Sequence, residues 1–280
     1  LKTGTQSNDY NITYEAGELE ITNASFGVTL TGGDWTYDGS SHSATLDYEA
    51  QSGDMVQYFV KQGSNWIPFA GTPSVTDVND GTVEIKVIVS RANYNSAEAT
   101  ATLSIAPATL TVTAADKTIT CPANRPAEAS LNYSVTAGLA SGESAGYTGT
   151  LAYASTLATQ PAAGTYYDVI EQGTLALADN AGGSFKASNY TLNFLEGDLT
   201  VNKGTMTVSA ADVTEAYDGG PHMVSPIASV SGAFIYYSLT DSTDPADYTM
   251  TAPSLVNVPD SDTVYFMAVD PNGNYNNAFG

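Results

Sequence analysis

Apolar and polar side chains alternate one for one along most segments of this chain that are long enough to form regular structure. A period of two places successive side chains on opposite faces, as a half-buried β-strand requires. Gly or Pro interrupts most windows of helical length. We therefore predict an all-β protein with at most single helical turns. The alternation is clearest at Thr82–Val89 (TVEIKVIV), Ala99–Ile105 (ATATLSI), Thr109–Thr113 (TLTVT) and Tyr190–Phe194 (YTLNF).

An internal repeat with a spacing of 180 residues indicates several similar domains. Residues 10–42 align with residues 190–222 without a gap, and eight of these 33 positions are identical. Residues 82–97 align with residues 263–278 after a slip of one residue. An Asn–Tyr or Asp–Tyr step also recurs, with its tyrosine at Tyr10, Tyr94, Tyr190 and Tyr275.

Each of these steps except the last precedes an alternating strand and then a short seam. The seams predict four parts: 1–23 as the closing hairpin of an upstream module, 24–107 and 204–280 as related Ig-like modules, and 108–203 as a module of a second type. We expect 204–280 to lack its last strand. Because the seams have almost no spare residues, we expect small β-sandwich modules of Ig-like or β-grasp-like type in an extended row.

The charge of the chain excludes several classes of partner. Lys and Arg total 8 against 30 Asp and Glu, a net charge of −22. Such a chain repels nucleic acid and anionic membranes. No apolar stretch is long enough to span a bilayer, so we expect no membrane insertion. The single cysteine, Cys121, excludes an intrachain disulfide. The first residues lack the pattern of a signal peptide and an initiator Met, so we expect them to lie inside a longer chain.

Four segments of residues 108–203 resemble the MBG repeat of the YGX type, which is found in bacterial surface proteins. One departure is Cys121-Pro122, where such repeats carry Tyr-Gly. The resemblance implies a bacterial protein that is extracellular or on the cell surface. The four segments are Ala108–Cys121 (ATLTVTAADKTITC), Tyr133–Ser144 (YSVTAGLASGES), Gly164–Ala176 (GTYYDVIEQGTLA) and Ser188–Lys203 (SNYTLNFLEGDLTVNK).

A Tyr-Asp-Gly triplet followed by His marks the two other modules, which resemble related bacterial Ig-like repeats. Asp-Gly is a hairpin signal, because Gly adopts positive φ and Asp bonds its own backbone. We expect a structural role for all of these residues, with both tyrosines buried and both histidines at equivalent sites. The shared offset of the histidines argues against a catalytic triad. The residues are Tyr37, Asp38, Gly39 and His42, and Tyr217, Asp218, Gly219 and His222.

Two groups of residues are candidates for ligand contacts. Asp241, Asp244 and Asp247 offer the hard oxygens that Ca²⁺ prefers, although solvated loop charge explains the same cluster. We therefore expect no cofactor, with structural calcium as the alternative. Trp66 and Trp35 are the aromatic residues best placed to contact a ligand such as a sugar, although loop packing more often explains a tryptophan in such a setting.

The sequence predicts a non-catalytic segment that acts as an adhesin stalk or interaction surface, with an unidentified protein or glycan as partner. The alternative is an accessory region, carbohydrate-binding or spacer, of a surface carbohydrate-processing enzyme. We expect a monomer. Residues 1–23 either pack on the neighbouring module or complete 204–280 of another copy, and we favour the first because a local contact costs no association entropy.

Overall fold

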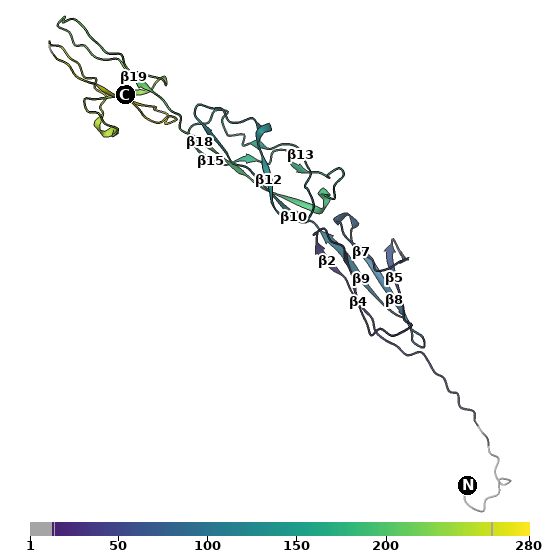
Figure 1. Ribbon diagram of the computed structural model, residues 1–280. Helices are drawn as coiled ribbons and strands as arrows, with labels where there is room; N and C mark the ends of the chain where they lie inside the picture. The colour runs from purple at the N-terminus through teal and green to yellow at the C-terminus, as the bar shows by residue number, and fades with distance from the viewer. Residues whose placement is uncertain (1–12, 14, 259) are drawn as a thin grey trace, which may run out of the picture. The chain divides into compact units, whose positions relative to one another are not determined.

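The computed structural model describes residues 13, 15–258 and 260–280 (Figure 1). Within these ranges the chain consists of strands, turns and 3₁₀ segments of three residues each, so the predicted all-β class of tandem small sandwiches is confirmed. No helix in the described ranges is long and apolar enough to cross a membrane. The chain divides into two compact units, Leu1–Pro107 and Ala108–Gly280.

The first unit is built around a five-stranded sheet in the order β2-β9-β8-β5-β6. The outermost strand β2 runs parallel to β9, and the other neighbours are antiparallel. The alternation predicted from sequence appears in β8, where Ile85, Val87 and Val89 are fully buried. The strand bounds are β2 Gly33–Thr36, β5 Met55–Gln62, β6 Asn65–Phe69, β8 Val83–Ser90 and β9 Ala97–Ala106.

Two small antiparallel pairs and a 3₁₀ segment complete this sandwich. The strand β9 contacts both η2 and β7 in addition to its sheet neighbours. This is why Leu103 and Ile105 near its end are 0% and 6% exposed. The pairs are β1 Thr29–Thr31 with β4 Thr45–Asp47 and β3 His42–Ser43 with β7 Ser74–Val75, and η2 spans Val78–Asp80.

A buried ion pair ties the loop before β5 to the end of β8. The Arg91 Nε and Nη2 atoms donate to the two carboxylate oxygens of Asp54 at 2.8 and 2.9 Å. The Arg91 guanidinium also lies 4.5 Å from the Phe26 ring centroid. The arginine, together with the backbone N–H of Gln51, lowers the pKa of Asp54 to about 2.

The second unit begins with a three-stranded sheet β12-β10-β17, a four-stranded sheet β11-β18-β15-β14 and the pair β13-β16. Leu110, Ile170 and Leu199 are fully buried between them. The bounds are β10 Ala108–Ala114, β11 Lys117–Thr120, η3 Glu128–Ser130, β12 Tyr133–Ala137, β13 Tyr147–Thr148, β14 Ala152–Tyr153, β15 Gly164–Glu171, β16 Ala176–Leu177, η4 Ala187–Asn189, β17 Tyr190–Leu195 and β18 Gly197–Asn202.

Residues 204–280 repeat the first unit with fewer strand residues. In β19-β20, Ser209 lies opposite Ile227. In the first unit, the residues 180 positions earlier, Thr29 and Asp47, form the same pair. The core here is a cluster around Phe266 and Ala268. The bounds are β19 Val208–Ser209, β20 Ile227–Ala228, β21 Phe234–Ser238, η5 Pro245–Asp247, β22 Tyr265–Val269 and β23 Ala278–Phe279.

The three Asn–Tyr steps in the described residues have the same structural partner. Each tyrosine forms a parallel bridge with the first residue after the preceding seam, which ties the start of a module to the segment that leads into its last strand. The three bridges are Ala24 with Tyr94, Ala108 with Tyr190 and Gly204 with Tyr275.

Residue 13 and residues 15–23 form no strand and lie exposed. Leu19 and Ile21 are 91% and 92% exposed. The expectation that this segment packs on residues 24–107 is therefore wrong for its described part. The reason is that β9 already occupies the closing-strand position of that sandwich. Tyr10, Ile12 and Tyr14, the alternating half of the predicted hairpin, lie outside the described residues.

Candidate functional site

The first Tyr-Asp-Gly turn is held by its own aspartate. The Oδ1 atom of Asp38 accepts the Ser40 N–H at 2.7 Å and lies 3.1 Å from Nε2 of His42. Gly39 has φ of 81°, in the left-handed region that glycine enters without strain. The Ser40 N–H and then the His42 ring lower the pKa of Asp38.

The second turn has the same geometry. The Oδ1 atom of Asp218 accepts the Gly220 N–H at 2.7 Å and lies 3.0 Å from Nε2 of His222. Gly219 has φ of 82°. The Gly220 N–H, followed by His222, lowers the pKa of Asp218.

Each histidine is also fixed by its position in a strand pair. His42 lies opposite Val75, and His222 lies opposite Leu255. The pairing of His222 includes two backbone hydrogen bonds with Leu255, of 2.9 and 3.0 Å. Both rings thus contact the aspartate of their own turn and face an apolar residue across the strand pair, which is a structural arrangement.

The two tyrosines differ, and the expectation that both are buried is wrong for Tyr217. Tyr37 is 7% exposed, whereas Tyr217 is 65% exposed. The Tyr37 N–H donates to the carbonyl of Ala106 at 2.8 Å, so the end of β9 covers this residue. The corresponding strand β23 comprises only Ala278–Phe279 and does not reach Tyr217.

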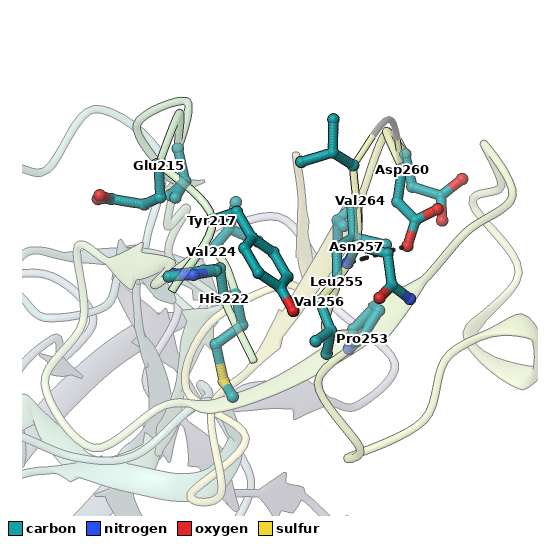
Figure 2. A pocket seen from close by; sticks show the side chains of 14 residues that line it. Glu215, Tyr217, His222, Val224, Pro253, Leu255, Val256, Asn257, Asp260 and Val264 are labelled. Atoms are coloured by element: carbon teal, nitrogen blue, oxygen red, sulfur yellow. Dashed lines mark hydrogen bonds between the residues drawn. The ribbon is translucent and has the colours of Figure 1, made fainter. Parts of the chain in front are cut away.

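The uncovered surface around Tyr217 is a groove of about 170 Å³. One wall is the segment that carries Val213, Glu215 and Tyr217, and the other includes Leu255 and Val264. Figure 2 shows Tyr217 between the segment of Glu215 and the segment of Leu255 and Val256.

The groove lies where the first unit holds the second half of β9. There, Leu103 pairs with Gly33 of β2 on one side and Val83 of β8 on the other. Val75, which β9 helps to cover, is 1% exposed, whereas its counterpart Leu255 is only half-buried. The groove can therefore accept an extended apolar segment.

Two of the three aspartates proposed for calcium accept hydrogen bonds from their own loop. Asp244 accepts the Ala246 N–H at 3.0 Å and caps η5, and Asp247 accepts the Ser242 hydroxyl at 2.5 Å. No group of three or more His, Cys, Asp or Glu that could hold a metal ion occurs in the described part of the chain. The structure thus does not assemble Asp241, Asp244 and Asp247 into a calcium site.

The two tryptophans lie on opposite edges of the five-stranded sheet, Trp35 on β2 and Trp66 on β6. Trp35 stacks on His42 with ring centroids 4.9 Å apart. The Nζ atoms of Lys61 and Lys86 lie 5.9 and 5.2 Å from the Trp66 ring centroid. The structure therefore does not bring the tryptophans into one platform, and side chains of the same unit contact both rings.

The sequence predicts that residues 204–280 lack their last strand, but it does not place a groove beside Tyr217. Residues 204–280 have the tyrosine, the turn and the histidine of the first module.

No family model matches the chain, and no curated protein matches it. Three solved structures to which the chain is similar are the N-terminal four Ig domains of Dscam1 isoform 9.44 with zinc, Drosophila OTK extracellular domains 3–5, and Sidekick-1 immunoglobulin domains 1–4. Their identities are 9%, 7% and 10%, with TM-scores of 0.23, 0.19 and 0.18. The matches cover 91%, 92% and 95% of this chain and 71%, 95% and 72% of the other chains.

Proposed function

We propose that this chain is a non-catalytic segment of a bacterial cell-surface or secreted protein, where it acts as an adhesin stalk or interaction surface. The observation that carries the proposal is the recurrence of the same tyrosine bridge in three successive stretches, 24–107, 108–203 and 204–280. A chain that repeats one unit gains length and surface rather than a single deep cleft.

The connections between these stretches are short. The strand β9 ends at Ala106 and β10 begins at Ala108, and β18 ends at Asn202 before the bridge residue Gly204. Within the second unit, the Ala163 N–H donates to Oδ1 of Asn274 at 2.8 Å, so 108–203 and 204–280 are also tied by a side chain. One-residue connections suit a spacer.

The histidines support a non-catalytic role. General acid–base or nucleophilic catalysis requires a histidine aimed at a nucleophile or a substrate. His42 and His222 instead contact Asp38 and Asp218 at the same offset in two turns. Each histidine is duplicated together with its strand partner, and a role in folding explains this duplication.

A surface location is supported by the charge of −22 and by the resemblance of residues 108–203 to MBG repeats. The high negative charge maintains solubility and disfavours nucleic acid and anionic membranes. We propose a protein or glycan of the cell surface as the partner. Carbohydrate binding through the tryptophans has less support, because Trp35 is stacked on His42 and two lysines lie over Trp66.

Small-angle scattering and hydrolysis assays on the full 280-residue chain test this proposal. A compact globule of this length has a radius of gyration of about 19 Å. A stalk predicts a value well above that and no hydrolysis of glycans or peptides. A radius near the compact value, or a hydrolytic activity that one point substitution abolishes, would contradict the proposal.

A further inference from the structure

The sheet β21-β22-β23 of residues 204–280 packs on the core with one of its two faces. Ile235 and Tyr237 of β21 lie against the cluster around Phe266 and Ala268. Because side chains alternate along a strand, the neighbouring residues of β21 and β22 project from the opposite face, which we call the outer face. The outer face carries Phe234 and Tyr236 of β21 and Tyr265, Met267 and Val269 of β22.

The outer face is apolar and partly open to solvent. Phe234 is 48% exposed, and its strand partner Val269 is half-buried. Thr249 forms an antiparallel bridge with Tyr237, which places Met250 at the edge of the outer face, where it is 63% exposed. Adjoining apolar side chains that are open to water are typical of a surface that contacts a partner.

The corresponding face of the first unit is charged. The Nζ atom of Lys61 lies 2.6 Å from Oε2 of Glu84. The Nζ atom of Lys86 lies 3.7 Å from Oε2 of Glu98 and 5.5 Å from the ring centroid of Phe59. Paired charges keep this side of an antiparallel sheet solvated, so the first unit needs no partner to cover it.

The repeat has apolar side chains in place of these charges. Tyr265 stands at the position of Glu84 in the aligned repeat. Met267 likewise stands at the position of Lys86, and it lies opposite Tyr236 in the sheet. Since the first unit folds with charged residues at these positions, the fold itself does not require an apolar outer face.

The loop between β21 and Thr249 forms one border of the outer face. Tyr248 is 7% exposed, and its ring centroid lies 5.7 Å from that of Phe279, which pairs with Met267. The Tyr248 hydroxyl donates to the carbonyl of Ser242 at 2.6 Å. The tyrosine therefore holds the loop against the sheet.

This border is acidic. Asp241, Asp244 and Asp247 are all exposed. Burial of the ring, followed by the charges of Asp241 and Asp247, raises the pKa of Tyr248, so both carboxylates lie close to that ring. Residues 204–280 contain nine Asp or Glu and no Lys or Arg, so they supply no basic side chain to neutralise the border.

We propose that the outer face of residues 204–280 binds a basic segment of a partner protein. The apolar side chains of that segment lie on Phe234 and Met250, and its Lys or Arg side chains lie at the aspartates of the border. This inference rests on the proposed function as an interaction surface and names the class of partner. An aromatic and Met-containing centre with a charged rim is typical of protein interfaces, and complementary charge orients the partner. Phe234 and Met250 carry no hydroxyl or amide group for sugar hydroxyls, which favours a protein over a glycan.

Titration calorimetry of the full 280-residue chain with three synthetic peptides tests the proposal. One peptide alternates Lys with Leu, the second Glu with Leu, and the third Lys with Ser. We expect the Lys/Leu peptide to bind at least about tenfold more tightly than either other peptide, because it alone matches both the apolar face and the acidic border. Its affinity should fall as salt is added. Amide shifts of residues 234–238 and 265–269 locate the peptide.

Matched variants separate the outer face from the general negative charge. Phe234→Ser/Met250→Ser should weaken binding of the Lys/Leu peptide at least about tenfold, whereas Met55→Ser, at an exposed apolar residue of the first unit, should not. Asp241→Asn/Asp247→Asn should weaken binding and reduce its salt dependence. The control Asp47→Asn/Glu49→Gln makes the same change in charge in the first unit and should retain both. Thermal unfolding of each variant checks that the fold is retained.

Three results would overturn the proposal. They are equal binding of the three peptides, equal effects of the outer-face variants and their controls, and shifts at residues 234–238 with neutral oligosaccharides but not with the Lys/Leu peptide, which would mean that the face binds a glycan. None of these results changes the expected radius of gyration or the absence of hydrolysis. The basic partner and the proposed stalk can therefore fail separately.

Discussion

Tyr275 lies opposite Gly204 in a parallel bridge, and the Gly204 carbonyl accepts the N–H of Asn276 at 2.9 Å. The glycine is required by its surroundings, because a Cβ at this position would lie 2.5 Å from the Cys121 carbonyl oxygen and 2.8 Å from the Tyr275 ring. The corresponding residues of the other two bridges, Ala24 and Ala108, do carry a Cβ.

Gly204→Ala should therefore destabilise the second unit by about 1–3 kcal/mol, the usual cost of inserting a methyl group into a packed site. Gly27→Ala is the matched control, because nothing lies within 4 Å of a Cβ there. Calorimetric unfolding of the full chain measures both. Equal stability of the two variants would contradict the close contact at Gly204.

The Asp54–Arg91 pair predicts a defined dependence of stability on acid. The folded pKa of Asp54 is about 2, below the value near 3.9 of an unperturbed Asp. A depressed pKa stabilises the fold above the unfolded value, and this stabilisation is lost as the pH falls from about 4 toward 2. Asp54→Asn should lower stability at neutral pH and flatten this part of the profile.

Urea unfolding across that pH range measures the effect. Glu98→Gln is the control, because the Glu98 side chain is 64% exposed and 3.7 Å from Lys86. An Asp54→Asn variant with the acid profile of the native chain would show that the ion pair does not form in solution.

Two tyrosines of residues 108–203 should respond to hydroxyl removal in opposite ways. The Tyr147 hydroxyl is buried and has no hydrogen-bond partner in the described residues. The Tyr190 hydroxyl donates to Glu143 at 2.6 Å and accepts the Ala140 N–H at 3.0 Å. We expect Tyr147→Phe to be neutral or stabilising by up to about 1 kcal/mol and Tyr190→Phe to cost about 1–2 kcal/mol. Thermal unfolding of both variants decides, and a larger loss for Tyr147→Phe would contradict the hydrogen-bond assignment.

Substitution of the two tyrosines of the Tyr-Asp-Gly turns should lower stability by different amounts, because one ring is buried and the other is exposed. Tyr37→Ala removes a buried ring and should cost about 3–5 kcal/mol. Tyr217→Ala removes a ring that is 65% exposed and should change stability by less than about 0.5 kcal/mol in dilute solution. Denaturant unfolding of the two units separates the effects, and equal losses would mean that Tyr217 is covered.

Local features of the fold follow from the sequence, whereas its long-range pairings do not. The alternation of Ile85, Val87 and Val89 predicts a half-buried strand because side-chain direction depends only on neighbouring residues. The Asp-Gly turns at Asp38 and Asp218 are predictable for the same reason.

The exposure of Tyr217 could not be predicted from its neighbours in the sequence. Its counterpart Tyr37 is covered by the end of β9, whose Ala106 is distant in sequence. Identical local sequence therefore yields two environments. The stacking of Trp35 on His42 is likewise a contact between separate strands, and no periodicity in the chain reports it.

The most direct test of the account is the amide exchange rate of Tyr37 compared with that of Tyr217 in the full 280-residue chain. The account predicts slow exchange at Tyr37, whose N–H donates to Ala106 at 2.8 Å, and fast exchange at Tyr217. Adding a peptide with the sequence of residues 97–107 (AEATATLSIAP) should slow Tyr217 and leave Tyr37 unchanged. Equal protection of the two amides without peptide, or a Tyr217 rate that the peptide does not alter, would contradict the assignment of an accessible groove beside Tyr217.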